Sequence, residues 1–185
     1  SDVVGSTELL TRLGDAAADD LRRTHTGAQS AAVRRFGGAV IKTLGDGIMA
    51  VFEGAADAVD AAVAIQEATS QVASDADVSL RVRVGVSSGD ASNEEGDWHG
   101  TPVVEASRLC GAARGGQILV ADLSRRLAGS RTSQAFASLG PLALKGLPDP
   151  VVVHEVVPSP DAPAPPASRS AATVSPPAAV VSRIN

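Results

Sequence analysis

The segment from Gly38 to Phe52 constrains the fold of this chain more than any other stretch. It reads GAVIKTLGDGIMAVF, in which two apolar, β-rich runs flank a short polar tip at 43–47. Strand-forming residues on both sides of an Asp-Gly pair are typical of a β-hairpin, because glycine adopts the positive φ that a tight turn requires. Lys42 lies four residues before Asp46, at the rim of the same hairpin. Asp46 is therefore either a simple turn residue or part of a site for a charged ligand or a metal, and this segment alone leaves both interpretations open.

The composition limits the class of protein. A length of 185 residues suffices for one domain with a buried core and a tail. The formal net charge of −5 argues against non-specific binding of nucleic acid. A single cysteine, Cys110, excludes an intramolecular disulfide framework, and no apolar run approaches the length of a membrane span. We therefore expect a cytoplasmic domain that contacts neither nucleic acid nor membrane.

The first residues, SDVVGST, predict the end of a strand that passes into a helix. The backbone amides of Gly5, Ser6 and Thr7 would lie at the helix start, where the helix dipole favours an anion such as phosphate. Asp2, just ahead, is placed for a cation that bridges to that phosphate. The alternative is that Ser6 or Thr7 simply caps the helix. The sequence lacks an initiator methionine and opens inside this motif, so we expect a truncated first strand.

The remaining chain alternates between helical and strand patterns. Period-two alternation of apolar residues predicts a strand at 80–86, and the polar stretch 91–100 predicts a loop or loose hairpin. Helices are expected at 15–36, 55–70, 101–113 and 122–128, and short strands near 117–120, 136–140, 142–145 and 151–157. His25 lies on the first of these helices, where we expect a solvated or packing role.

The chain divides into two parts near residue 157. From Pro158 to Asn185 the composition changes to Pro, Ala and Ser without periodicity. This predicts a disordered linker or tail at 158–185, after a folded domain at 1–157.

Together the motifs of residues 1–157 resemble those of the class III nucleotidyl cyclase catalytic domain, in particular its bacterial, actinobacterial-like members. The resemblance is carried in order by DVVGST, KTLGDGIMAVF, LRVRVGVSSGD, GDWHG, EASRLC and LKGLPDPVVVHEV, and the first two together make it specific. It implies an α+β fold of the ferredoxin-like βαββαβ type, a mostly antiparallel sheet flanked by helices. It also implies a head-to-tail homodimer with active sites at the interface, and leaves room for fused regulatory domains.

The resemblance also assigns roles to individual residues. Asp2 and Asp46, with the carbonyl of Val3, would hold two Mg²⁺ or Mn²⁺ ions on one chain, and the amides around Gly5, Ser6 and Thr7 would cradle the phosphates. The other chain would supply Lys42 and Asp97 to select the base and Arg108 for the α-phosphate, and Lys145 resembles the lysine that meets the triphosphate. A lysine that donates to purine N1 and an aspartate that accepts from the 6-amino group match adenine and mismatch guanine. The implied activity is adenylate cyclase, a phosphorus–oxygen lyase in which the ribose 3′-hydroxyl of ATP attacks the α-phosphorus, giving 3′,5′-cyclic AMP and pyrophosphate.

One position departs from the family pattern. Four residues before Arg108, where the family has an asparagine that orients the ribose, this chain has Val104. A valine cannot hydrogen-bond the sugar, so we expect reduced turnover. The alternative is a catalytically weak or inactive cyclase-like domain that binds nucleotide or dimerises for regulation.

Overall fold

The computed structural model describes residues 1–4, 13–157 and 180–182. Its helices are α2 (Asp15–Arg35), α3 (Ala55–Asp75), α4 (Thr101–Ala112), α5 (Asp122–Ala128) and the short 3-10 turn η1 (Gly129–Arg131). Its strands are β1 (Asp2–Val4), β2 (Ala39–Leu44), β3 (Gly47–Phe52), β4 (Arg81–Ser88), β5 (Ser92–Glu94), β6 (Asp97–His99), β7 (Ile118–Ala121), β8 (Ala135–Leu142), β9 (Val151–Val157) and β10 (Val180–Ser182). The hairpin expected at 38–52 is confirmed as β2 and β3.

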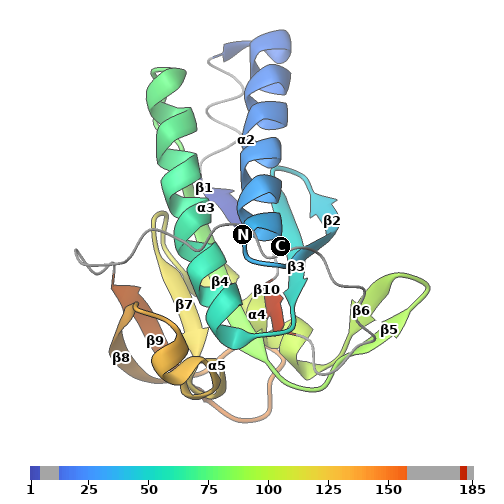
Figure 1. Cartoon of the computed structure of the whole chain (residues 1–185), viewed down its shortest axis with the longest axis vertical. Helices are drawn as coiled ribbons and strands as arrows, with labels where there is room; N and C mark the ends of the chain where they lie inside the picture. The colour runs from blue at the N-terminus through green and yellow to red at the C-terminus, as the bar shows by residue number, and fades with distance from the viewer. Residues whose placement is uncertain (5–12, 158–179, 183–185) are drawn as a thin grey trace.

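Eight strands form one sheet in the order β2-β3-β10-β4-β7-β9-β8, with β1 paired to β4. β4 and β7 run parallel, and the other pairs of this sheet are antiparallel. β5 and β6 form a separate hairpin that extends to one side of the body (Figure 1). The fold is α+β, with a mostly antiparallel sheet and flanking helices, as the sequence predicts.

The side chains of β4 alternate between the two faces of the sheet, because successive residues of a strand point in opposite directions. Val82, Val84 and Val86 are fully buried in the main core, with residues of α2, α3 and α5. Gly85 faces α4, where a Cβ would lie 2.2 Å from the carbonyl oxygen of Ala106. Helices α2, α3 and α5 therefore cover one face, and α4 packs on the other with almost no space for a side chain at its closest approach.

The strand β10 lies within the segment that the sequence assigns to a linker or tail. The backbone of Val180–Ser182 pairs antiparallel with both β3 and β4, and the assignment of 158–185 as a whole stays a prediction. Val180 lies opposite Phe52 of β3 and Ser88 of β4. This segment runs in the same direction as β1, because both strands pair antiparallel with β4. Composition alone did not reveal it, because three residues are too few to show a strand period.

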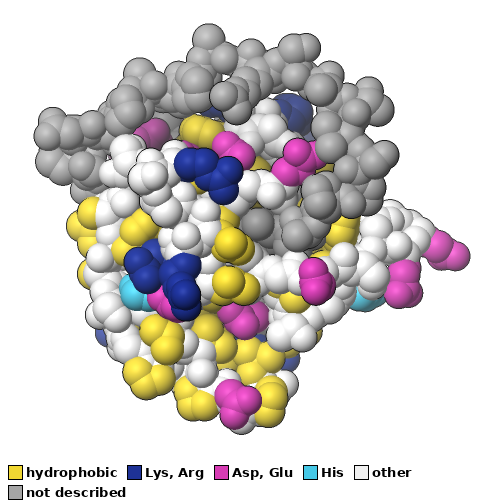
Figure 2. Space-filling view, turned by 60° about the horizontal axis from the view of Figure 1, so that its bottom comes forward, with side chains coloured by type: hydrophobic (Ala, Val, Ile, Leu, Met, Phe, Trp, Pro, Cys, Tyr) yellow, Lys and Arg dark blue, Asp and Glu magenta, His cyan; other side chains and the backbone are white. Residues whose placement is uncertain are grey.

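Apolar side chains also reach the surface. On the face shown in Figure 2 they form several separate groups between polar atoms and small groups of Lys and Arg. Large apolar residues that are exposed include Val4, Val104, Leu123, Leu127, Leu139, Leu142, Val152 and Val157. Of these, Val104 lies beside a residue of the candidate site described next.

Candidate active site

A β-bulge in β2 determines where Lys42 points. Val40 lies opposite Ala50, but Lys42 lies opposite Met49, so the register shifts by one residue between them. Without the shift, Lys42 would share the face of Val40, whose side chain packs against the main core. With it, Lys42 shares the face of Met49, which packs against Val103 and Ala106 of α4. The bulge thus moves a cation out of an apolar core and onto the α4 side of the sheet.

Lys42 forms an ion pair with Asp97, the first residue of β6. The second carboxylate oxygen of Asp97 accepts a hydrogen bond of 2.9 Å from the backbone N–H of Trp98. The hydrogen bond from Lys42, together with that from Trp98, holds the pKa of the Asp97 carboxyl below its ordinary value. Two residues that lie 55 positions apart in the sequence are therefore brought together in an ion pair.

Asp46 lies in the turn between β2 and β3, flanked by Gly45 and Gly47. Gly45 has φ +64°, the left-handed conformation that favours glycine. The carboxylate oxygen Oδ2 of Asp46 is buried and has no hydrogen-bond partner among the described residues. Such an oxygen is costly to bury alone, and a divalent cation is one group that satisfies it. The carboxylate oxygen at the hairpin tip is therefore suited to bind a metal ion.

Asp2, the other expected metal ligand, has a partner already. Its Oδ2 accepts hydrogen bonds from Nε of Arg83, at 2.9 Å, and from Nη2. Arg83 also donates to the carbonyl oxygen of Gly111 at the end of α4, at 3.0 Å. A cation at Asp2 would share this carboxylate with Arg83 or displace it. Val3 packs its side chain among Val72 and Leu80, and the role of its carbonyl as a ligand stays a prediction.

The segments that carry Asp2 and Asp46 lie side by side. The backbone nitrogen of Ser1 donates to the carbonyl oxygen of Ile48, at 3.1 Å. Ser1 is the residue before Asp2, and Ile48 is two residues after Asp46. The two carboxylate-bearing segments, far apart in the sequence, therefore meet at one end of β3.

Arg108 and Lys145 are also adjacent. Nε of Arg108, on α4, donates to the carbonyl oxygen of Lys145 at 2.8 Å, and the side chain of Lys145 is exposed. Val104 lies one helical turn before Arg108 on the same face of α4, and 36% of its surface is exposed. Glu105 does not pair with Arg108; it accepts a hydrogen bond of 3.1 Å from Ser87, and burial raises the pKa of its carboxyl.

The expected site residues thus fall into separate groups: Asp2 with Asp46, Lys42 with Asp97, and Arg108 with Lys145. Within 1–4, 13–157 and 180–182, no recorded hydrogen bond or ion pair joins one group to another. The same ranges hold no cluster of three or more His, Cys, Asp or Glu side chains suited to a metal ion. Gly5, Ser6 and Thr7 lie outside the described residues.

Two contacts near these groups have no signal in the sequence. Arg83 pairs with Asp2, which lies 81 positions away. His25 was expected to be solvated or to pack; it is 2% exposed and hydrogen-bonded at both ring nitrogens. Burial lowers the pKa of His25 to about 4, so the ring is neutral at pH 7. Thr69, which hydrogen-bonds to His25, lies on another helix, so the sequence around His25 does not indicate this contact.

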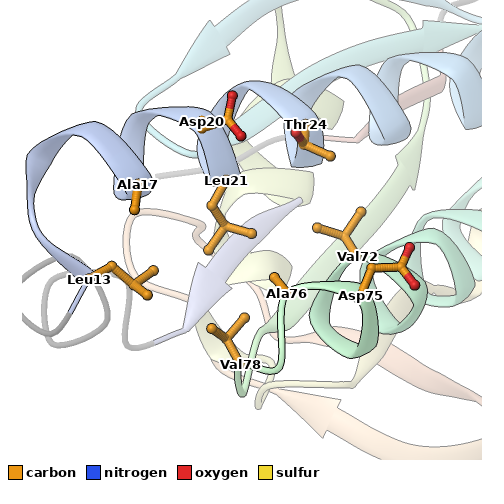
Figure 3. A pocket seen from close by; sticks show the side chains of 9 residues that line it. All are labelled: Leu13, Ala17, Asp20, Leu21, Thr24, Val72, Asp75, Ala76 and Val78. Carbon is orange, nitrogen blue, oxygen red and sulfur yellow. The ribbon is translucent and has the colours of Figure 1, made fainter.

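A pocket of about 380 Å³ lies apart from these groups, between the start of α2 and the end of α3 (Figure 3). Leu13, Leu21, Val72 and Val78 form its apolar lining, and Asp20 and Asp75 lie at its margin. None of the expected site residues that the structure describes lines it. No described helix has the length and apolar character that crossing a bilayer requires.

The family model described as the adenylate and guanylate cyclase catalytic domain matches residues 1–157. The chain belongs to this family. Members of the class III cyclase family bind nucleotide substrates, generally use divalent metals and often dimerise. The expected resemblance is therefore confirmed over the whole range that the sequence assigned to the folded domain.

Individual relatives agree with this assignment. The chain is 38% identical, over 58% of its length, to a pH-sensitive adenylate cyclase of Mycobacterium tuberculosis, of which it covers 27%. It is 34% identical, over 91% of its length, to an uncharacterized M. tuberculosis protein of which it covers 44%. The chain thus spans less than half of these curated relatives.

Solved structures give the same fold. The adenylate/guanylate cyclase/hydrolase from Silicibacter pomeroyi superposes with a TM-score of 0.71 at 31% identity, and the match covers 85% of this chain and 93% of that one. The adenylyl cyclase CyaB from P. aeruginosa has a TM-score of 0.75 at 24% identity, covering 88% and 93%, and supports the fold alone.

Proposed function

We propose that this domain is an adenylate cyclase, which converts ATP to 3′,5′-cyclic AMP and pyrophosphate. The observation that carries the proposal is the Lys42–Asp97 pair. A lysine is a pure donor and an ionised aspartate a pure acceptor, which complement N1 and the 6-amino group of adenine. Guanine presents a carbonyl and a protonated N1, so both contacts would be mismatched.

The proposed cofactor is a pair of Mg²⁺ or Mn²⁺ ions held by Asp2, Asp46 and the carbonyl of Val3. The buried, unpaired Oδ2 of Asp46 supports this placement. Bound divalent ions supply Lewis-acid activation of the ribose 3′-hydroxyl and offset phosphate charge. The backbone amides of Gly5, Ser6 and Thr7 are proposed to donate to phosphate oxygens at the helix start.

Arg108 and Lys145 are proposed to act on the phosphates. The guanidinium of Arg108 donates to the α-phosphate oxygens, where negative charge grows as the 3′-hydroxyl oxygen bonds to phosphorus. The ammonium of Lys145 holds the triphosphate, from which pyrophosphate leaves. The Arg108–Lys145 backbone contact supports a common location for the two cations.

The proposed active form is a homodimer. Among the described residues, no hydrogen bond or ion pair joins the Asp2–Asp46 group to the Lys42–Asp97 group, and a complete site is proposed to combine one group from each protomer. Frequent dimerisation in the family supports this arrangement.

Replacing Lys42 by glutamate tests the proposed substrate. We expect the ratio of kcat/KM for ATP to that for GTP to fall by about 10–100-fold, because glutamate accepts where adenine N1 needs a donor. Cyclic AMP and cyclic GMP are measured with Mn²⁺ for the wild type and for Lys42→Glu. Arg34→Glu, on an exposed part of α2, makes the same charge change and should leave the ratio unaltered. A wild-type protein that prefers GTP would refute the proposal.

Val104 favours a second candidate, a cyclase-like domain with a regulatory role and weak catalysis. Its exposed methyl groups lie one turn from Arg108 and offer no hydrogen bond to a ribose. Val104→Asn is expected to raise kcat about tenfold, the effect of one orienting hydrogen bond. ATP binding without turnover in both proteins, measured by calorimetry and product formation, would favour the regulatory function.

A further inference from the structure

Gln29 connects the two segments that carry the proposed metal ligands. It lies on α2 and is fully buried. Its Nε2 donates to the carbonyl oxygen of Asp46 at 3.3 Å, and its Oε1 accepts a hydrogen bond from the hydroxyl of Ser1. Ser1 immediately precedes Asp2. One side chain therefore bonds to the Asp46 backbone and to the residue next to Asp2.

The direction of every bond in this network follows from Thr69. The hydroxyl of Thr69 donates its only hydrogen to the carbonyl of Ile65, at 2.7 Å, so it must accept from Nε2 of His25, at 2.9 Å. Nδ1 of the neutral ring is then unprotonated and accepts from Nε2 of Gln29, at 3.1 Å. The second N–H of the same amide group is left for Asp46. His25 and Thr69 thus fix the amide of Gln29 in one orientation.

The turn that carries Asp46 has few restraints of its own. Gly45 and Gly47 flank Asp46, and glycine permits more backbone conformations than any other residue. Oδ2 of Asp46 itself has no hydrogen-bond partner among the described residues. The backbone bond from Gln29 is therefore a contact that restrains Asp46 from outside the hairpin.

We infer that Gln29 is a positioning residue for the cation site, which holds the Asp46 segment at a fixed place relative to the Asp2 segment before the ions bind. This inference rests on the proposed function, because it takes Asp2 and Asp46 as the cation ligands. A preorganised pair of carboxylates binds a cation more tightly than a pair that must be ordered during binding. Loss of the amide should therefore weaken cation binding more than it weakens the fold.

The test replaces Gln29 by methionine, which keeps the length of the side chain and removes its hydrogen-bonding groups. Binding of Mn²⁺ to the full chain, with a non-hydrolysable ATP analogue present, is followed by the electron paramagnetic resonance signal of free Mn²⁺. We expect about tenfold weaker binding for Gln29→Met, the effect of one hydrogen bond. The Mn²⁺ concentration for half-maximal turnover should rise by the same factor.

Gln66→Met is the matched control. Gln66 is half-buried on α3 and donates to the carbonyl of Val82 at 2.9 Å, so the same change removes a similar bond elsewhere. It should lower the melting temperature and leave Mn²⁺ affinity unchanged. Thr69→Val removes the far end of the network, and we expect about threefold weaker Mn²⁺ binding, which carries the test should Gln29→Met not fold.

The outcomes separate this inference from the proposed function. Mn²⁺ binding that is weaker in Gln29→Met and Thr69→Val but unchanged in Gln66→Met supports the positioning role, even if the wild type forms no cyclic AMP. Equal Mn²⁺ affinity in the wild type, Gln29→Met and Gln66→Met would overturn it, even if the wild type is an active cyclase. Absence of Mn²⁺ binding by the wild type would overturn it as well.

Discussion

Replacing Asp46 by asparagine is expected to lower the turnover of ATP by at least about 100-fold, because the proposed ions lose a charged ligand that supplies several kcal/mol of transition-state stabilisation. The amide has the same shape as the carboxylate, so the hairpin should fold as before. In the wild type, Oδ2 of Asp46 has no hydrogen-bond partner among the described residues, so the substitution breaks no hydrogen bond at that atom. We therefore expect a nearly unchanged melting temperature together with the loss of activity.

The measurement compares cyclic AMP formation and Mn²⁺ binding in the wild type and in Asp46→Asn. Asp77→Asn is the matched control, since Asp77 is also in a turn, is exposed and has φ +50°, a conformation that asparagine tolerates. The control should retain full activity. An Asp46→Asn protein with turnover within threefold of the wild type would show that the ions, if bound, are held elsewhere.

Replacing Arg108 by alanine is expected to lower kcat by about 100–1000-fold and to change KM for ATP less than threefold. The reason is that a donor aimed at developing charge stabilises the transition state more than the bound substrate. Arg108→Lys should recover only part of the loss, because an ammonium cannot reproduce the planar, bidentate geometry of a guanidinium. Single-turnover measurements with saturating Mn²⁺ separate the chemical step from substrate binding.

The structure also limits what Arg108→Ala does to stability. Its recorded hydrogen bond is to the carbonyl of Lys145, in a partly exposed position, so the loss of folding free energy should be small. Arg114→Ala, just beyond α4 and exposed, is the control for charge alone. Equal losses in the two variants, or a loss confined to KM, would remove Arg108 from the proposed chemistry.

The local elements were predictable from the sequence, and their mutual contacts were not. The apolar runs around an Asp-Gly pair predicted β2 and β3 correctly, and the alternation over 80–86 predicted β4. The parallel pairing of β4 with β7 was not predictable, because the apolar pattern of a strand is the same whether its neighbour runs parallel or antiparallel to it. The bulge that turns Lys42 toward α4 is likewise invisible in the pattern, since Ile41 and Lys42 look like an ordinary alternation.

In the candidate site too, the sequence indicated individual residues, but not the contacts between residues far apart in the chain. The family resemblance assigned Lys42 and Asp97 to base selection, which stays a prediction, and the ion pair between them was not predicted. The contact between Asp2 and Arg83 spans 81 positions, and that between His25 and Thr69 spans 44, so neither has a periodic or neighbouring signal in the chain. Only the packing of α2 against α3 and of β1 against β4 produces them.

The Lys42–Asp97 pair has a consequence for how a nucleotide would enter the proposed site. Each side chain satisfies the other before any base arrives, so an incoming ring must first separate them. A base that presents an acceptor to Lys42 and a donor to Asp97 replaces both lost bonds. Any other base leaves one of the two charged groups without a hydrogen-bond partner. If the proposed function holds, the closed pair would exclude bases that do not match it, and selectivity would come from the rejection of mismatched bases more than from the attraction of adenine.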